Sequence, residues 1–240
     1  MTLLRDDDLS AAFNHGSLAC DRLVAVNPGY RSDLRRSARR LGLADGGRGM
    51  RLLDLGCRTG ASTAALLKAA RHAEIVAVDA SAGMLERAAA KCRPANVTFV
   101  HAPVEAMDES QVHGSFDAAF AAYLFRNVSD PDQVLAVVRD LLVPGGRLAV
   151  HEFTLDSGRV HRAVWSAVCG AVVVPGRWLT GVAALYRHLR RSFLEFDTAT
   201  DFASRLRRGS FGRVRVRPRG QTGITHTFVA QAPGAVRDQA

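Results

Sequence analysis

The sequence predicts an α/β domain: a doubly wound, Rossmann-like mixed β-sheet with helices on both faces. Apolar, strand-like runs alternate with helical segments between residues 51 and 153, which is typical of parallel strands joined by right-handed crossovers. The run 51–54 ends at Asp54 and breaks into a glycine-bearing turn. The segments 214–217 and 225–231 alternate like a closing antiparallel hairpin.

Length and composition fit this fold. The chain has 240 residues, 48% of them apolar, which suits one domain with a sizeable core and argues against disorder. Its 4 cysteines lie far apart without a C-x-x-C pair, so disulfide and metal interpretations are weak and a reducing cytoplasm is favoured. The longest apolar run, 163–175, is shorter than the about 20 residues that span a bilayer, and the N-terminus is too acidic for a secretory signal.

We expect a single domain, 1–240, that is divided into consecutive parts. These parts are a helical N-terminal segment (1–45), a ligand-binding core (50–153), a helical C-terminal lid insert (155–205) and the closing hairpin (210–232). Within them, strands are expected at 51–54, 74–79, 97–101, 116–122 and 147–153, and helices at 61–71, 82–92, 131–142 and 197–208. Pro131 suits the first turn of its helix, and Thr198 or Thr200 is a plausible N-cap.

The segment 51–79 has the plan of a nucleotide-binding site. Gly56 and Gly60 follow the first strand, a helix begins at once, and the second strand ends at Asp79. Glycines let a ligand approach the backbone, the helix N-terminus offers N–H groups, and the second acid can accept ribose hydroxyls. The D-x-G-x-R-x-G spacing from Asp54 fits an S-adenosylmethionine (SAM) loop better than a dinucleotide loop. The alternative is an ordinary turn without a ligand.

Candidates for chemistry lie near the ends of later strands. Arg126 follows the strand 116–122 at the edge where open α/β sheets bind ligands. Its guanidinium could orient a phenolate oxygen, or it could simply cap a helix and form an ion pair. His151, beside Glu152, and His226 are acid–base candidates, each weighed against a structural role.

The charge balance favours anionic partners. The net charge is +9 and the pI is about 10.4, which suits a membrane surface or nucleic acid. Much of the excess lies at Arg205, Arg207, Arg208, Arg213, Arg215, Arg217 and Arg219. We interpret this run as a solvated edge or as a surface that attracts anionic lipid. Nucleic acid is disfavoured, because the sequence has no RNA-binding module.

Several stretches together resemble class I SAM-dependent methyltransferases, and more narrowly the ubiquinone/menaquinone biosynthesis C-methyltransferase family. They are 53–60 (LDLGCRTG), 78–85 (VDASAGML), 124–131 (LFRNVSDP), 143–148 (VPGGRL) and 152–153 (EF). Weaker echoes are Phe13, Asp21, 186–189 (YRHL), Phe211, 223–224 and His226. The resemblance covers nearly the whole chain.

The resemblance implies SAM as cofactor and methyl transfer to a hydrophobic quinol or phenol acceptor, without a metal. The family's pattern favours a ring carbon as the methylated atom, with a ring oxygen as the alternative. The implied cofactor residues are Asp54, Gly56, Arg58, Thr59, Gly60, Asp79, Ala80, Met84, Pro103, Val104 and Ala122. The implied catalytic candidates, which we do not rank, are Arg126, Tyr186 and His226. A homodimer and a peripheral contact with anionic membrane are also compatible with the sequence.

The chain departs from the family's pattern at several positions. Arg58 stands where the family has its middle glycine, and Pro103 replaces the acid usual after the third strand. Ala122 replaces a small polar residue, and Cys20 replaces a tyrosine. These departures support an alternative: a divergent SAM-fold protein with weak or no methyltransferase activity that acts as a binding or partner subunit.

Overall fold

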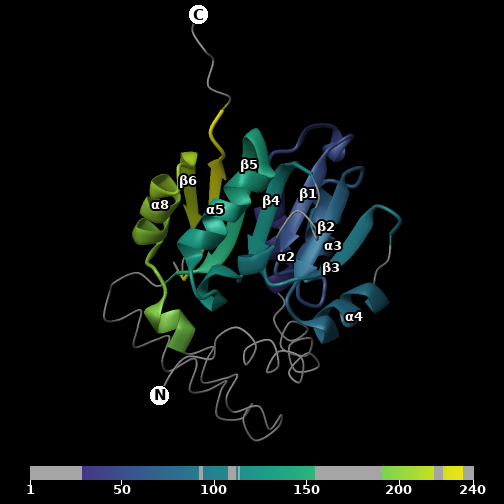
Figure 1. The fold of residues 1–240 in the computed structure, drawn as a ribbon, viewed down its shortest axis with the longest axis horizontal. Helices are drawn as coiled ribbons and strands as arrows, with labels where there is room; N and C mark the ends of the chain where they lie inside the picture. The colour runs from purple at the N-terminus through teal and green to yellow at the C-terminus, as the bar shows by residue number, and fades with distance from the viewer. Residues whose placement is uncertain are drawn as a thin grey trace, which may run out of the picture.

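A seven-stranded sheet forms the centre of the computed structural model, which describes residues 29–91, 94–107, 112, 114–154, 191–218 and 224–234. The strand order is β3-β2-β1-β4-β5-β7-β6 (Figure 1). The strands are β1 (Arg51–Leu55), β2 (Glu74–Asp79), β3 (Val97–His101), β4 (Phe116–Ala122), β5 (Leu142–Phe153), β6 (Gly212–Pro218) and β7 (Thr225–Gln231). The described helices are α2 (Tyr30–Arg39), α3 (Ala61–Ala69), α4 (Ala82–Lys91), α5 (Pro131–Leu141) and α8 (Ala199–Arg208), with short 3-10 turns η1 (Ala44–Gly47), η2 (Val104–Ala106) and η3 (Phe125–Asn127).

The sheet is mixed, as the sequence predicts. Strands β3, β2, β1, β4 and β5 are parallel, whereas β7 runs antiparallel to both β5 and β6. The order in which the chain adds strands reverses between β1 and β4, which are neighbours in space. The chain adds β2 and β3 on one side of β1, and β4 and β5 on the other. Ligands bind at the carboxyl ends of the strands at such a switch point, so the fold places the expected site there.

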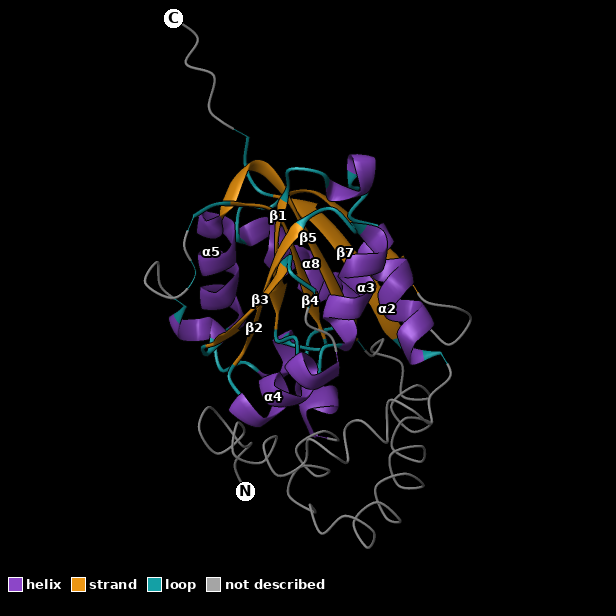
Figure 2. Ribbon diagram, turned by 90° about the vertical axis from the view of Figure 1, so that its right-hand side faces the viewer, coloured by secondary structure: helices purple, strands orange, loops and turns teal. Residues whose placement is uncertain are grey.

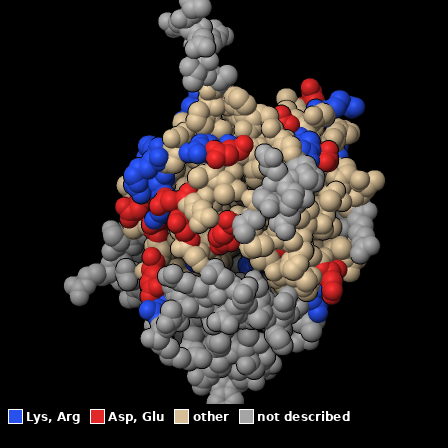
Figure 3. Space-filling view, in the orientation of Figure 1, with Lys and Arg blue, Asp and Glu red and all other residues tan. Residues whose placement is uncertain are grey.

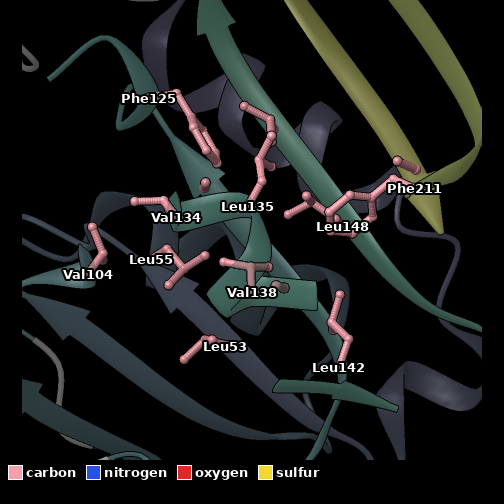
Figure 4. Close-up of a cluster of buried hydrophobic side chains, with 14 of the residues drawn as sticks. Leu53, Leu55, Val104, Phe125, Val134, Leu135, Val138, Leu142, Leu148 and Phe211 are labelled. Atoms are coloured by element: carbon pink, nitrogen blue, oxygen red, sulfur yellow. The ribbon is translucent and has the colours of Figure 1, made fainter. Parts of the chain in front are cut away.

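Helices cover both faces of the sheet (Figure 2). Helices α2 and α3 lie on one face and α5 on the other, and α8 contributes Phe202 and Leu206 to the core on the α5 side. Two apolar layers result: one beneath α2 and α3, the other between the sheet, α5 and α8. Figure 4 shows part of the second layer, where Leu53 and Leu55 of β1 lie near Val134 and Val138 of α5.

Local sequence signals fix the helix ends on the α5 side. Pro131 occupies the first turn of α5, and the Asp130 side chain accepts hydrogen bonds from the backbone N–H groups of Asp132 and Gln133. Thr198 caps α8, because its hydroxyl accepts from Asp201 N at 3.2 Å. The sequence left Thr198 and Thr200 open as caps, and the structure selects Thr198.

The start of β5 and the expected lid differ from the sequence-based expectation or lie partly outside the described residues. Strand β5 begins at Leu142 rather than at 147, because Leu142 already pairs with Phe116 ahead of a register shift in the ladder. The expected lid lies mostly outside the described residues, at 155–190. Its described end includes α8, which packs against β6 and β7 as part of the body.

Candidate functional site

The loop between β1 and α3 lies at the switch point and packs tightly. Gly56 has φ +64°, and a Cβ there would lie 2.9 Å from Leu124 Cδ1. Gly60, with φ +85°, precedes α3, and a Cβ there would lie 3.1 Å from the Ala88 Cβ of α4. Both positions need glycine for conformation and for space. The loop backbone is therefore fixed in one path, with its N–H groups at the carboxyl edge.

Asp79 holds this loop from the neighbouring strand. Its Oδ2 accepts from the backbone N–H of Arg58 at 2.8 Å, and its Oδ1 accepts from that of Ser81 at 2.9 Å. Burial raises the pKa of Asp79, while these backbone hydrogen bonds oppose the rise. Each carboxylate oxygen can accept a second hydrogen bond, so Asp79 can position the loop and still accept from ribose hydroxyls.

Asp54 is fully buried beneath the same loop. Its Oδ2 accepts from Ser62 Oγ at 3.0 Å and from Thr63 Oγ1 at 2.6 Å, both at the start of α3. Its Oδ1 has no hydrogen-bond partner among the described residues. Burial raises the pKa of Asp54 to about 7. An unpartnered carboxylate oxygen is costly in a protein interior, and a bound ligand with a polar or cationic group would relieve that cost.

Arg58 lies in the loop after β1, where we expect the methionine end of SAM. Its backbone has φ +52°, a left-handed conformation that suits the glycine it replaces. The adjoining pocket, which Tyr30, Arg58, Ser62 and Ala122 help to line, has a volume of about 10 Å³. That is room for about one water molecule, so binding of a larger group in this pocket would require lining residues to move. The loop, Asp79 and the Asp54 oxygen otherwise fit the cofactor.

The other expected cofactor residues lie around this loop. Thr59 is buried, and its carbonyl accepts from Lys91 Nζ at 3.2 Å. Ala80 follows β2, and its carbonyl is 3.0 Å from His101 Nε2. Met84 is buried in α4, Val104 is buried at the start of η2, and Pro103 is exposed. The structure thus gathers these residues near the carboxyl ends of β2 and β3.

A buried ion pair joins the ends of β4 and β5. Arg126 Nε donates to Glu152 Oε1 at 3.2 Å, and the two side chains are 3% and 0% exposed. Arg126 Nη1 donates to Ser192 Oγ at 3.0 Å and to Asn127 Oδ1 at 3.4 Å. Burial lowers the pKa of Arg126 and raises that of Glu152, and each opposes the shift of the other. Glu152 Oε2 lacks a hydrogen-bond partner among the described residues.

Aromatic rings surround this pair. The Arg126 guanidinium carbon lies 4.7 Å from the ring centroid of Phe193 and 5.9 Å from that of Phe153. Phe153 also contacts Tyr123 at 4.7 Å between centroids, and Tyr123 stacks on Tyr30 at 5.4 Å. We call Tyr30, Tyr123, Phe153 and Phe193 the aromatic cluster. It extends from the narrow pocket by Arg58 to the Arg126–Glu152 pair.

The histidine candidates fall into different environments. His226 of β7 lies opposite Glu152 in the ladder, and its Nδ1 is 2.6 Å from Thr154 Oγ1. His151 is buried on the other face, where its Nδ1 lies 2.8 Å from Ser37 Oγ of α2 and its Nε2 lies 3.1 Å from the Tyr123 hydroxyl. The structure therefore brings His226 beside the Arg126–Glu152 ion pair. His151 instead connects Ser37 of α2 to Tyr123 after β4. Tyr186 lies outside the described residues.

Sequence reasoning missed some members of this site. Glu152 was noted as a neighbour of His151 and within the family stretch 152–153, but no role was given to it, and Tyr123 and Ser192 were not considered. Glu152 carried a usable signal, since an acid directly after a buried strand is costly without a partner. Ser192 carried none, because its contact with Arg126 spans 66 residues.

The strand order, the glycine loop at the switch point and the acid at the end of β2 define a class I SAM-dependent methyltransferase fold with its cofactor site. The profile of the family described as "Methyltransferase domain" matches residues 52–146. The chain is 34% identical over 215 residues to the demethylmenaquinone methyltransferase of Clavibacter sepedonicus, which covers 87% of this chain and 84% of that protein. The chain therefore belongs to the ubiquinone/menaquinone biosynthesis C-methyltransferase family; it is a SAM-dependent methyltransferase, and its cofactor is SAM.

A second relative and a solved structure agree with this placement. The ubiquinone/menaquinone biosynthesis C-methyltransferase of Rhizobium etli (strain CIAT 652) is 33% identical over 172 residues, or 69% of this chain and 66% of that protein. This alignment thus spans just under two thirds of the Rhizobium protein. Phosphoethanolamine N-methyltransferase 2 of Haemonchus contortus superposes with a TM-score of 0.67 at 15% identity, covering 92% of this chain and 57% of that one. This likeness shows the fold.

Proposed function

We propose that this methyltransferase methylates a ring carbon of a hydrophobic quinol or related phenol. The observation that carries the proposal is the buried Arg126–Glu152 pair beside the aromatic cluster, at the carboxyl edge next to the SAM loop. A flat aromatic acceptor is suited to stacking against such rings. The names of the Clavibacter and Rhizobium relatives point to the same class of acceptor.

Carbon methylation requires an electron-rich ring. Loss of a hydroxyl proton gives a phenolate, whose negative charge is shared with the ring carbon that forms the new bond. Bound SAM supplies the activated methyl group. As the carbon–carbon bond forms, the bond between the methyl group and sulfur breaks, which leaves S-adenosylhomocysteine. The same carbon then loses its proton, the oxygen regains one, and the ring becomes aromatic again. The protein must therefore accept a proton and stabilise an oxyanion.

The residues at the site suit these tasks. The Arg126 guanidinium is held by Glu152, Ser192 and Asn127, and its Nη2 is hydrogen-bonded to none of the described residues. This geometry makes Nη2 a donor for the phenolate oxygen. His226, which is fixed through Thr154, is a candidate for proton acceptance, directly or through water. Tyr186 remains a further candidate by resemblance.

Arg58 bears on how the cofactor enters. Its side chain stands at the methionine side, where SAM carries a carboxylate, and guanidinium–carboxylate pairs are strong when they are bidentate. We infer that Arg58 swings from the narrow pocket when SAM binds. The alternative of a binding or partner subunit without activity rests on this same residue, and the family membership favours the enzyme.

A turnover assay tests the proposal. The purified full chain is incubated with methyl-labelled SAM and a chemically reduced short-prenyl naphthoquinol, and the product is analysed by mass spectrometry and NMR. We expect label on a ring carbon, with turnover reduced by about 10²-fold or more in Arg126→Lys, which keeps the charge but loses the planar fork. Label on oxygen, or no turnover while SAM binds normally, would contradict the proposed acceptor chemistry.

We further propose a peripheral contact with anionic membrane, since a prenylated acceptor resides there. Within the described residues, no helix is long and apolar enough to cross a membrane. The described arginines of the basic run, 205–217, do not form one surface. Arg205 forms ion pairs with Asp197 at 2.6 Å and Asp132 at 2.5 Å, whereas Arg213, Arg215 and Arg217 lie on β6. The arginines of β6, rather than Arg205, would therefore attract an anionic membrane.

A further inference from the structure

A cavity of about 260 Å³ lies between the end of α2 and the outer strands of the sheet. Its charged lining consists of Arg40 after α2, Arg147 of β5, and Arg213 and Arg215 of β6. We call it the arginine pocket. The sheet register explains the convergence. Arg147 lies opposite Gln231, and Arg215 opposite Val229, so side chains from three adjacent strands share the α2 face.

The guanidinium groups of this pocket have no acidic partner among the described residues. Within the part of the chain that the structure describes, Arg40, Arg147, Arg213 and Arg215 form no ion pair with a carboxylate. The face formed by α5 and α8 differs. There Arg205 is paired with Asp132 and Asp197, and Figure 3 shows basic and acidic side chains next to one another.

The arginines are held in place by the fold. Arg147 Nη1 donates to the carbonyls of Leu41 at 2.5 Å and Gly42 at 2.7 Å, at the negative end of the α2 dipole. Gly42 leaves the room for this, because a Cβ there would lie 2.9 Å from Arg147 Nη1. In β6, Arg213 has φ +49°, next to a register shift between Gly212 and Arg215. Such bulges change the direction of side chains and are often found next to active sites.

Like charges crowd around the pocket. Arg36 of α2 and Arg40, the C-cap residue that follows the helix, are four residues apart, a spacing at which equal charges repel. Arg40 Nη1 donates to the Arg217 carbonyl at 3.3 Å. Burial lowers the pKa of Arg40, and the neighbouring Arg36 and Arg217 add to the lowering. A bound anion would remove this repulsion.

Two simpler explanations cover only part of the pattern. Charged residues on an outer strand discourage pairing with other chains, which accounts for Arg213 and Arg215 but not for Arg147 of β5. Cations favour a helix C-terminus, which accounts for Arg40 but not for the β6 arginines. Neither explanation predicts that side chains from α2, β5 and β6 meet around one cavity without a carboxylate.

We propose that the arginine pocket is a binding site for a compact, multiply charged phosphate group. A single carboxylate would leave most of these guanidinium groups without a partner, whereas phosphate groups accept several bidentate forks at once. The volume lies below the roughly 300–1,000 Å³ of pockets for drug-sized ligands, which suits a diphosphate or a lipid headgroup. The site is distinct from the SAM loop, and the proposal does not depend on the identity of the methyl acceptor.

The test uses inorganic pyrophosphate as the probe. Its binding to the full chain is measured by calorimetry at constant ionic strength, since salt screens exposed charges. The pocket variant is Arg213→Gln with Arg215→Gln. The control is Arg207→Gln with Arg208→Gln, which removes equal charge from exposed positions on α8. We expect at least about a tenfold weaker binding in the pocket variant only, since charged hydrogen bonds are lost. Thermal melting without ligand shows that both variants are folded.

A second arm identifies the source of the phosphate. Phosphatidylcholine vesicles with and without phosphatidylglycerol are sedimented with each protein. Binding to anionic vesicles that is lost only in the pocket variant assigns the pocket to a lipid headgroup, whether or not pyrophosphate also binds. Pyrophosphate binding that is lost only in that variant, without vesicle binding, assigns it to a soluble phosphate compound. Equal losses in both variants, or no binding to either probe, overturn the proposal.

Discussion

The buried carboxyl group of Asp54 makes the stability of this protein depend on pH in a particular direction. Its folded-state pKa is raised from 3.8 to about 7 by burial, so between these values the folded protein holds a proton that the unfolded chain has lost. The stability contribution is therefore complete below the unfolded pKa and is lost as the pH rises through about 7. We expect Asp54→Asn, which cannot ionise, to remove this part of the pH dependence.

The magnitude follows from the two pKa values. Between about pH 5 and about pH 8, this shift lowers the free energy of unfolding by roughly 2.6 kcal/mol, and over the whole titration by about 4 kcal/mol. Urea unfolding of wild type and Asp54→Asn is measured at both pH values without ligand. The wild type should lose about 2–3 kcal/mol more than the variant across this interval.

A surface substitution controls for general effects of charge. Asp140→Asn removes one carboxylate whose side chain is 69% exposed, and its pH profile should run parallel to that of the wild type. Parallel profiles for Asp54→Asn and wild type would show that Asp54 does not titrate in this interval. They would refute the inference that its unpartnered oxygen lies in a dry interior.

Three further predictions concern the site. Asp79→Ala should weaken SAM binding by about 1.5–3 kcal/mol, the scale of hydrogen bonds to a charged group; unchanged affinity in calorimetry would remove Asp79 from the ribose site. Arg58→Gly should tighten SAM binding, because it frees space and suits the backbone at φ +52°; weaker binding would mean that Arg58 contacts the cofactor. Glu152→Ala should lower the free energy of unfolding by about 3–5 kcal/mol by leaving the Arg126 charge buried and unpaired, and adding Arg126→Met should restore much of the loss. A double variant as unstable as Glu152→Ala would argue against the unpaired charge as the cause.

The sheet could be predicted well from the sequence. The expected bounds of β2, β3 and β4 agree with those observed, because strands buried on both faces form short apolar runs between glycine and polar turns. The glycine turn after β1 and the acid at the end of β2 could also be predicted, since Asp54, Gly56, Gly60 and Asp79 lie within one local stretch. That these residues bind SAM stays a prediction.

The rest of the site depends on contacts between distant parts of the chain. Glu152 meets Arg126 only because β4 and β5 are neighbours in the sheet, 26 residues apart along the chain. The arginines at 205–217 form one cluster in the sequence, yet Arg205 is paired on the α8 side while Arg215 lies across from Val229 on the other. Local patterns identify the residue types, but the strand order decides which of them meet.

The hydrogen bonds around His151 bear on how the acceptor specificity of this enzyme could change. Through Ser37, Thr227 and Tyr123, the imidazole ties α2, β7 and the end of β4 to β5. These hydrogen bonds fix the aromatic cluster from outside the segment 51–104, although Tyr30 also lines the narrow pocket by Arg58. Exchanging Phe153 or Phe193, which do not line that pocket, should redirect acceptor choice while cofactor affinity stays the same. The two halves of the reaction can therefore diverge, or be engineered, independently of each other.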